Sequence, residues 1–278
     1  MGSFVTSDGV RLNYADQGSG VPIVFSGGWA MDGMLWWQHQ VSLSSRYRVI
    51  VLDPRSQGAS EKVSRGIRLG RQAKDLRELF ELLGLTDVVH VAWSRSSSIA
   101  LAYWELFGGD LLSGLVLVGI TPSMARRPDW EWGYTIDPLQ FQEEILNDHE
   151  GVVRRVVEAV LLQPPSEELF EEMVRTTMAT PAIVGARMLE DHGAIDWRDM
   201  LGTIDRPTLV CVGQHDRNAP KEAAEFVSSN IPGALFEVFA ESAHAPFFEE
   251  PEKFNEVLTS FIRDCVFGGP IEFQDGSV

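Results

Sequence analysis

The chain has 278 residues, of which 44% are hydrophobic and 23% charged, so it can bury a large core and global disorder is not expected. Its formal net charge of −17 argues against nucleic-acid binding and against docking on an anionic membrane. No apolar run reaches the ~18 residues that span a bilayer. Cys211 and Cys265 lie in apolar segments and form no disulfide framework. Since the N-terminus also lacks a signal-peptide pattern, we expect a cytoplasmic protein with two core thiols.

The first 120 residues alternate short apolar strands with helices. Two alternating runs joined by Asp8-Gly9 predict a hairpin. Residues 69–85 carry apolar side chains at helical spacing, and they separate continuous apolar runs that are typical of buried strands. Those runs cover residues 22–25, 47–53, 88–92 and 114–119. This alternation predicts βαβ units and a mostly parallel sheet with helices on both faces.

The middle of the chain differs from the two parts that flank it. Residues 121–200 contain no strand-like run and predict helices only, whereas residues 201–278 resume the alternation of strands and helices. We therefore expect a core domain built from residues 1–120 and 201–278, with residues 121–200 inserted as a helical cap. Ligands of open α/β sheets bind at the carboxyl ends of the strands. An insertion that leaves the sheet at these carboxyl ends would cover the ligand site.

The stretch "AWSRSS" at residues 92–97 joins an apolar strand to a helix. A nucleophile held on such a sharp turn needs small residues two before and two after it, because the backbones crowd there. Ser94 has Ala92 and Ser96 at these positions, although glycine is usual at the second. Serine-rich polar turns are also common, so this stretch alone leaves both interpretations open.

Two further polar residues follow later predicted strands. Asp216 lies just past the strand at 208–212, and His244 follows the strand at 235–239. Each alone could be an ordinary turn or loop residue, but all three side chains are expected at the same edge of the sheet. A serine hydroxyl needs a base within hydrogen-bond reach, and a histidine base needs an anion that fixes its tautomer. The sequence therefore supplies one candidate for each role.

The chain resembles the α/β-hydrolase fold family over nearly its whole length, and within it the serine esterases and cofactor-free haloperoxidase-like enzymes. The segments that carry the resemblance are "GGW" (27–29), "DPRSQGAS" (53–60), "AWSRSS" (92–97), "LVLVG" (115–119), "VGQHD" (212–216) and "SAHAPFFEEPEKFN" (242–255). The resemblance implies Ser94 as nucleophile, Asp216 as acid and His244 as base. It further implies that the backbone N–H groups of Trp29 and Arg95 form an oxyanion hole. It implies no cofactor, and no cluster has metal-ligand spacing.

The chain departs from the family pattern at three places. Gly27-Gly28 stands where His-Gly is usual, and Ala30 replaces the proline that is usual in the haloperoxidase-like members, so plain hydrolysis is better supported than peroxide chemistry. Arg95 is unusual beside the nucleophile. Its side chain could hold a substrate carboxylate or pair with an acidic residue of the cap, and the sequence leaves both open.

The pattern as a whole predicts hydrolysis of a small, apolar or aromatic carboxylic ester or lactone through an acyl-enzyme. Two alternatives stay open: the same triad in another reaction of this fold, or a pocket that binds without turnover. The other reactions are C–C bond hydrolysis, cofactor-free oxygenation and natural-product tailoring. We expect a small-molecule substrate as partner, and homo-oligomers stay possible. The residues expected to line the pocket are Gly28, Trp93, Trp130, Trp132 and Phe247.

Overall fold

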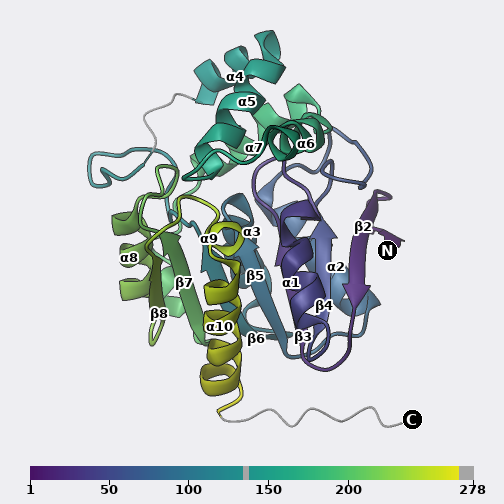
Figure 1. Ribbon diagram of the computed structural model, residues 1–278, viewed down its shortest axis with the longest axis vertical. Coiled ribbons are helices and arrows are strands. Elements are labelled where there is room, and N and C mark those ends of the chain that lie inside the picture. The colour runs from purple at the N-terminus through teal and green to yellow at the C-terminus, as the bar shows by residue number, and fades with distance from the viewer. Residues whose placement is uncertain (134–137, 269–278) are drawn as a thin grey trace.

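The computed structural model describes residues 1–133 and 138–268. Within them, eight strands form one sheet in the order β1-β2-β4-β3-β5-β6-β7-β8. β2 is antiparallel to β1 and β4, and the other neighbouring strands are parallel, which confirms the predicted fold (Figure 1). The strands are β1 (Gly2–Val5), β2 (Arg11–Gln17), β3 (Pro22–Ser26), β4 (Arg48–Asp53), β5 (Val88–Trp93), β6 (Leu112–Val118), β7 (Thr208–Gly213) and β8 (Leu235–Phe239).

Helices cover both faces of this sheet. The core on one face takes side chains from α2, α3 and α8, and the core on the other takes side chains from α1 and α10. The helices are α1 (Trp37–Leu43), α2 (Leu69–Leu82), α3 (Arg95–Phe107), α4 (Pro138–Asn147), α5 (His149–Val160), α6 (Glu167–Met178), α7 (Ala182–Ala194), α8 (Lys221–Asn230), α9 (Pro246–Glu249) and α10 (Pro251–Phe261), with 3₁₀ turns η1 (Gly33–Trp36) and η2 (Leu201–Thr203) and a π-helical turn η3 (Ile262–Val266). None of the helices in the described residues is long and apolar enough to cross a membrane.

The burial of the strands follows their sequence patterns. Every residue of β3, β5 and β7 is buried, as expected for continuous apolar runs covered on both faces. The edge strand β1 and its neighbour β2 form the predicted hairpin, in which the Thr6 N–H donates to the Val10 carbonyl at 2.9 Å and Gly9 has a φ of +79°. Cys211 is buried in β7, but Cys265 is exposed, so the prediction of two core thiols was wrong for Cys265, which lies in η3 at the end of the described chain.

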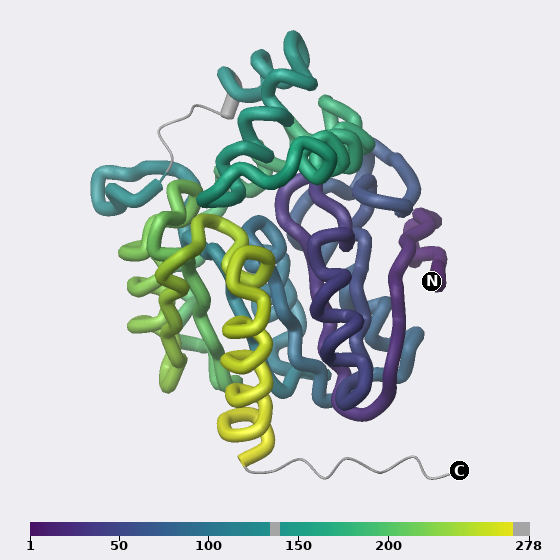
Figure 2. Tube along the Cα trace, in the orientation of Figure 1, coloured from purple at the N-terminus to yellow at the C-terminus, as the bar shows by residue number. Residues whose placement is uncertain are grey.

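The four helices α4 to α7 form a layer over the carboxyl ends of the parallel strands (Figure 1). The chain leaves the sheet after β6 and returns at β7, so that this helical layer lies on the same side as the loops after β3 and β5 (Figure 2). An apolar cluster joins the layer to the loop after β3. Its buried members are Trp29, Ala30, Ile67, Ile145, Val152, Val184, Ala186 and Met188.

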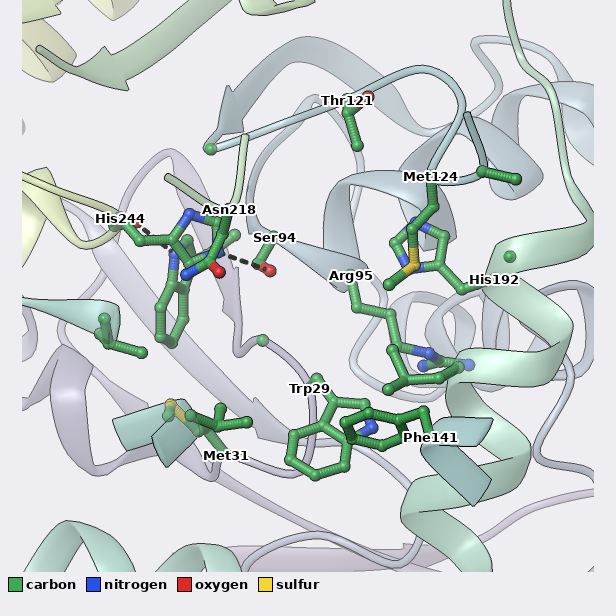
Figure 3. Close-up of a pocket in the computed structure, with 18 residues that line it drawn as sticks. Trp29, Met31, Ser94, Arg95, Thr121, Met124, Phe141, His192, Asn218 and His244 are labelled. Atoms are coloured by element: carbon green, nitrogen blue, oxygen red, sulfur yellow. Dashed lines mark hydrogen bonds between the residues drawn. The ribbon is translucent and has the colours of Figure 1, made fainter. Parts of the chain in front are cut away.

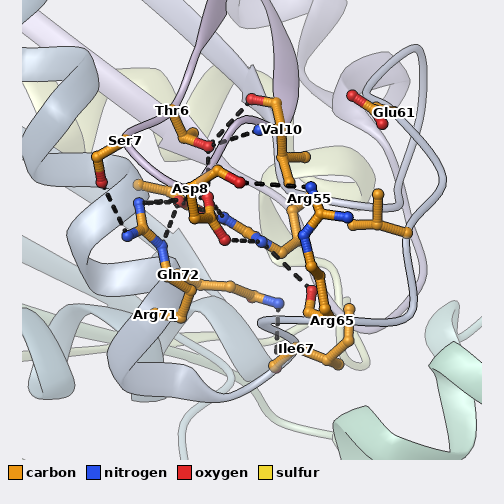
Figure 4. A network of polar contacts seen from close by, with 12 residues as sticks. Thr6, Ser7, Asp8, Val10, Arg55, Glu61, Arg65, Ile67, Arg71 and Gln72 are labelled. Atoms are coloured by element: carbon orange, nitrogen blue, oxygen red, sulfur yellow. Dashed lines mark hydrogen bonds and ion pairs between the residues drawn. The ribbon is translucent and has the colours of Figure 1, made fainter.

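A buried arginine fastens the hairpin to the core. The Arg55 side chain is fully buried, and its guanidinium donates to Asp75 of α2 and to Asp8 of the hairpin turn, at 2.8–2.9 Å (Figure 4). Arg71 donates to Asp75 and Glu78 on the outer side of the same network. Because two carboxylates meet the buried guanidinium, its charge is paired where water cannot reach it.

Candidate active site

Ser94 occupies a strained turn between β5 and α3. Its φ of +56° and ψ of −122° lie in a region that residues with a side chain rarely adopt, and its N–H donates to the Val118 carbonyl at 2.7 Å. Such a turn lifts the side chain away from the helix that follows it. Ser96 and Ser97 are both buried, and their hydroxyls donate to the carbonyls of Gly27 and Ala92. Their hydroxyls are therefore occupied in holding the turn.

The structure brings Ser94, His244 and Asp216 together in one chain of hydrogen bonds. Nε2 of His244 lies 2.9 Å from Oγ of Ser94 (Figure 3). Nδ1 of His244 lies 2.8 Å from Oδ2 of Asp216. Oδ1 of Asp216 accepts from the N–H groups of Asn218 and Ala219 at 2.8 and 2.9 Å. The buried carboxylate orients Nδ1–H toward itself, so Nε2 is left as the acceptor for the serine proton.

The loop that carries His244 is held from three sides. The His244 N–H donates to the Val160 carbonyl at the end of α5, and the indole N–H of Trp93 donates to the His244 carbonyl at 2.7 Å. On the third side, Gly119 at the end of β6 has a φ of +58°, and a Cβ there would lie 2.9 Å from the His244 ring. Glycine directly after a strand was the signal of a close approach.

The two glutamates after His244 brace the same loop. Oε2 of Glu249 accepts from the Ala243 N–H at 2.7 Å, and Oε1 accepts from the Leu162 N–H. Glu250 accepts from the hydroxyl of Ser242 at 2.7 Å. Burial raises the pKa of Glu249. These contacts give the "FFEEP" segment a physical role, because they fix the loop on which the imidazole depends.

The backbone N–H groups of Trp29 and Arg95 lie at the cavity wall and have no acceptor within the described residues. Arg95 is the first residue of α3, where a helix leaves its N–H groups unsatisfied and carries partial positive charge. A Cβ on Gly28 would lie 3.2 Å from the Trp93 ring and 3.3 Å from Cβ of Ser94, so the loop passes close to the serine. This arrangement can bind a negatively charged oxygen next to Ser94.

The side chain of Arg95 is buried and points away from Ser94 (Figure 3). Its guanidinium donates to Oε1 of Gln72 at 2.7 Å, to the Ile67 carbonyl at 3.0 Å and to the Met188 carbonyl of α7 at 3.3 Å. Burial lowers the pKa of Arg95 to about 10, so the group is still charged at neutral pH. Its partners are neutral oxygens, whereas the sequence had suggested a substrate carboxylate or an acidic cap residue.

Ser94 and His244 line a cavity of about 200 Å³ between the sheet edge and the helical layer. Its wall is mostly apolar, and the predicted Gly28 and Trp93 are part of it. From the helical layer and the segment before it come Met124, Phe141, Val156, Leu189 and His192. Sequence reasoning missed these five. The periodicity of a helix shows that one face is apolar, but it does not show whether that face meets a cavity or another helix.

Three aromatic residues expected in the pocket lie elsewhere. Trp130 is buried, donates its indole N–H to the Ser123 carbonyl and packs edge-on against Phe226 of α8 and against Trp132. Phe247 is fully buried behind the site, where it stacks on Trp36 with centroids 3.8 Å apart and contacts Trp93. The prediction that these rings line the cavity was wrong, because each finds a closer apolar partner in the protein core.

Comparisons with known proteins agree with this architecture. A family model described as alpha/beta hydrolase fold matches residues 21–251. A non-heme chloroperoxidase from Kitasatospora aureofaciens is 30% identical over 274 residues, covering 93% of this chain and 98% of its own. A pimeloyl-[acyl-carrier protein] methyl ester esterase from Nitrosomonas europaea is 29% identical over 253 residues, covering 87% and 96%. An esterase from Exiguobacterium antarcticum has a TM-score of 0.90 at 30% identity, covering 94% and 99%. The chain therefore belongs to the α/β-hydrolase fold family of enzymes.

Proposed function

We propose that this α/β-hydrolase, an enzyme that acts on ester bonds, is a serine hydrolase whose triad is Ser94, His244 and Asp216. The observation that carries the proposal is the unbroken pair of hydrogen bonds, 2.9 Å from His244 Nε2 to Ser94 Oγ and 2.8 Å from His244 Nδ1 to Asp216 Oδ2. A nucleophile, a base and an orienting anion in this geometry support acyl transfer. The esterases among the similar proteins support the same class of reaction.

In the first half of the reaction, Oγ of Ser94 forms a bond to the ester carbonyl carbon while its proton passes to Nε2 of His244. The carbonyl oxygen becomes an oxyanion, which the N–H groups of Trp29 and Arg95 bind. When the tetrahedral intermediate collapses, the bond to the alcohol oxygen breaks and that oxygen takes the proton from His244. An acyl-enzyme remains on Ser94.

In the second half, a water molecule takes the place of the alcohol. His244 removes its proton as the water oxygen bonds to the acyl carbon, and it returns that proton to Oγ of Ser94 when the acid leaves. The Asp216 carboxylate supports the imidazolium in both halves. Two backbone N–H groups donate to its other oxygen and hold the carboxylate in place.

The cavity supports a small and largely apolar substrate. A volume of about 200 Å³ admits a short acyl or aryl ester or a lactone, and the apolar wall would bind it through desolvation. Thr121 and Asn218 are among the few polar residues of the wall, and each donates to a backbone carbonyl of the protein. A neutral substrate matches this lining better than an anion does, because the net charge of −17 repels anions.

A covalent probe tests the proposal directly. Phenylmethylsulfonyl fluoride should sulfonylate one serine, and peptide mass spectrometry should place the label on Ser94. The labelled protein should no longer hydrolyse p-nitrophenyl butyrate. A label on Ser96, or steady hydrolysis by a fully labelled protein, would contradict the proposed nucleophile. A label on Ser94 in a protein that hydrolyses no ester would instead favour a site that binds without turnover.

A further inference from the structure

A second histidine lines the cavity, on the side opposite the triad. His192, in the last turn of α7, forms part of the wall together with Met124 and Leu189. In Figure 3 it lies across Ser94 from His244, and the proposed mechanism gives it no role. Its side chain is buried, and Nε2 lies 2.8 Å from Oγ of Ser98 on α3. The question is what the other ring nitrogen does.

The contact with Ser98 sets the tautomer of this imidazole. The Ser98 side chain is 1% exposed, and within the described residues its hydroxyl has Nε2 of His192 as its one hydrogen-bond partner. A buried hydroxyl proton without an acceptor costs about 1–3 kcal/mol. Ser98 therefore donates to Nε2, and the ring proton of His192 resides on Nδ1.

Nδ1 of His192 has no protein partner in the part of the chain that the structure describes. It differs in this from Nδ1 of His90, which is also unpartnered but sealed inside the sheet. Because His192 forms part of the cavity wall and its Nδ1, unlike that of His90, is not sealed from water, we infer that this N–H faces the cavity. The side chains of Arg95, Thr121 and Asn218 already donate hydrogen bonds to oxygens of the protein. His192 thus offers a donor that the protein itself leaves unused.

This donor is uncharged at the pH at which hydrolases work. Burial, together with the nearby positive charge of Arg95, lowers the pKa of His192 to about 3. A neutral N–H beside an apolar wall suits a neutral acceptor oxygen. Binding such an oxygen requires no counter-charge, and the hydrogen bond is formed away from competing water.

We propose that Nδ1–H of His192 binds a second carbonyl oxygen on the substrate, so that the natural substrate is an ester or lactone that carries a keto or amide carbonyl on the same acyl group as the scissile one. The inference rests on the proposed serine hydrolase function, since it assumes that the substrate reacts at Ser94. It narrows the proposed substrate class from plain apolar esters to esters that carry an uncharged hydrogen-bond acceptor. That acceptor would lie on the side of the cavity away from His244. His192 is thereby a specificity residue.

Matched esters test this assignment. We suggest comparing p-nitrophenyl 4-oxopentanoate with p-nitrophenyl pentanoate, and p-nitrophenyl 5-oxohexanoate with p-nitrophenyl hexanoate. The rates are divided by those of the same esters with hydroxide, which removes differences in intrinsic reactivity. The natural protein should show a higher kcat/KM for the oxo ester in at least one pair. His192→Leu should lower that ratio by roughly 2- to 12-fold, the value of one neutral hydrogen bond. The ratio within a pair is the readout, because any effect of the variant on the shape or stability of the wall falls on both esters and cancels.

Two further variants serve as controls. His192→Asn carries an amide nitrogen near the place of Nδ1 and should keep part of the preference. Leu189→Ala changes the shape of the same wall without removing a donor, so it should alter both members of a pair alike. The inference is overturned if no pair shows a preference, or if His192→Leu and Leu189→Ala have the same effect. Failure of the proposed function would look different, because no ester would then be hydrolysed and Ser94 would stay unlabelled.

Discussion

Trp29 and Arg95 hold the same helix with their side chains. The indole N–H of Trp29 donates to the Gly185 carbonyl of α7 at 2.9 Å, and the guanidinium of Arg95 donates to the Met188 carbonyl, three residues further along, at 3.3 Å. The backbone N–H groups of these two residues lie at the cavity wall near Ser94, and they have no acceptor in the described part of the chain. The position of α7 is therefore linked to both halves of the proposed oxyanion hole.

Replacing the nucleophile should abolish hydrolysis without unfolding the protein. Ser94→Ala should lose about 10³-fold or more in kcat on p-nitrophenyl butyrate, because the attacking oxygen is gone. The matched control is Ser96→Ala, whose hydroxyl only donates to the Gly27 carbonyl and whose loss should be much milder. If Ser96→Ala were the inactive variant, Ser94 would not be the nucleophile.

The orientation of His244 by Asp216 can be tested by an isosteric change. Asp216→Asn keeps the shape of the side chain but presents no anion to Nδ1, so the imidazole is misoriented and its cation unsupported. We expect kcat to fall on the order of 10³- to 10⁴-fold while circular dichroism stays the same. His244→Ala should be similarly inactive. Appreciable ester hydrolysis by both folded variants would rule out this triad.

Gly119 should matter because of the space that it leaves for His244. Gly119→Ala would place a Cβ 2.9 Å from the His244 ring, on a residue with a φ of +58°. Gly84 is a matched control, since its φ is +61° but a Cβ there meets nothing within 4 Å. Both variants should lose about 1–2 kcal/mol of stability from the left-handed backbone, but only Gly119→Ala should lose kcat. Equal kcat values for the two variants would show that the close approach has no effect on the reaction.

Arg95 should act on all substrates alike. Arg95→Met removes a guanidinium that donates to buried oxygens of Gln72, Ile67 and Met188. Oε1 of Gln72 would be left without a donor, which costs about 1–3 kcal/mol. We expect a lower melting temperature and an equal loss of kcat/KM on a neutral ester and on its carboxylated analogue. A selective loss on the carboxylated ester would mean that Arg95 recognises an anion.

The ionic network around Arg55 should make stability depend on pH. The hydrogen bonds from Arg55 hold the pKa of the Asp8 carboxyl well below its usual value. A carboxyl with a lowered pKa in the folded state stabilises the protein above pH ~4, and this contribution is lost as the pH falls. Arg55→Met should cost up to about 3–5 kcal/mol at pH 7, because Asp75 loses its buried partner and keeps only Arg71, on the outer side of the network. In urea titrations the difference between the two proteins should narrow toward pH 3; a constant difference would argue against the pairing.

Much of the fold followed from local sequence patterns. Continuous apolar runs predicted β3, β5 and β7, and the alternation of strands with helices predicted a mostly parallel sheet. Ser94, Asp216 and His244 could be chosen because each follows a strand, and parallel strands end at one edge of the sheet. Periodicity and chain order are properties of short segments, so they can be read without knowing which segments pack together.

The lining of the cavity was decided by tertiary packing. Trp130 and Phe247 are as apolar as Phe141, yet they pack against other core rings while Phe141 lines the cavity. The partners of Arg95 and the tautomer of His192 likewise depend on how α7 lies over α3. Contacts between segments about 90 residues apart in the chain leave no pattern in the local sequence. Helical periodicity shows which residues share an apolar face, but it does not show what that face packs against. The sequence by itself determined which residues could react, and the packing of α7 determined what surrounds them.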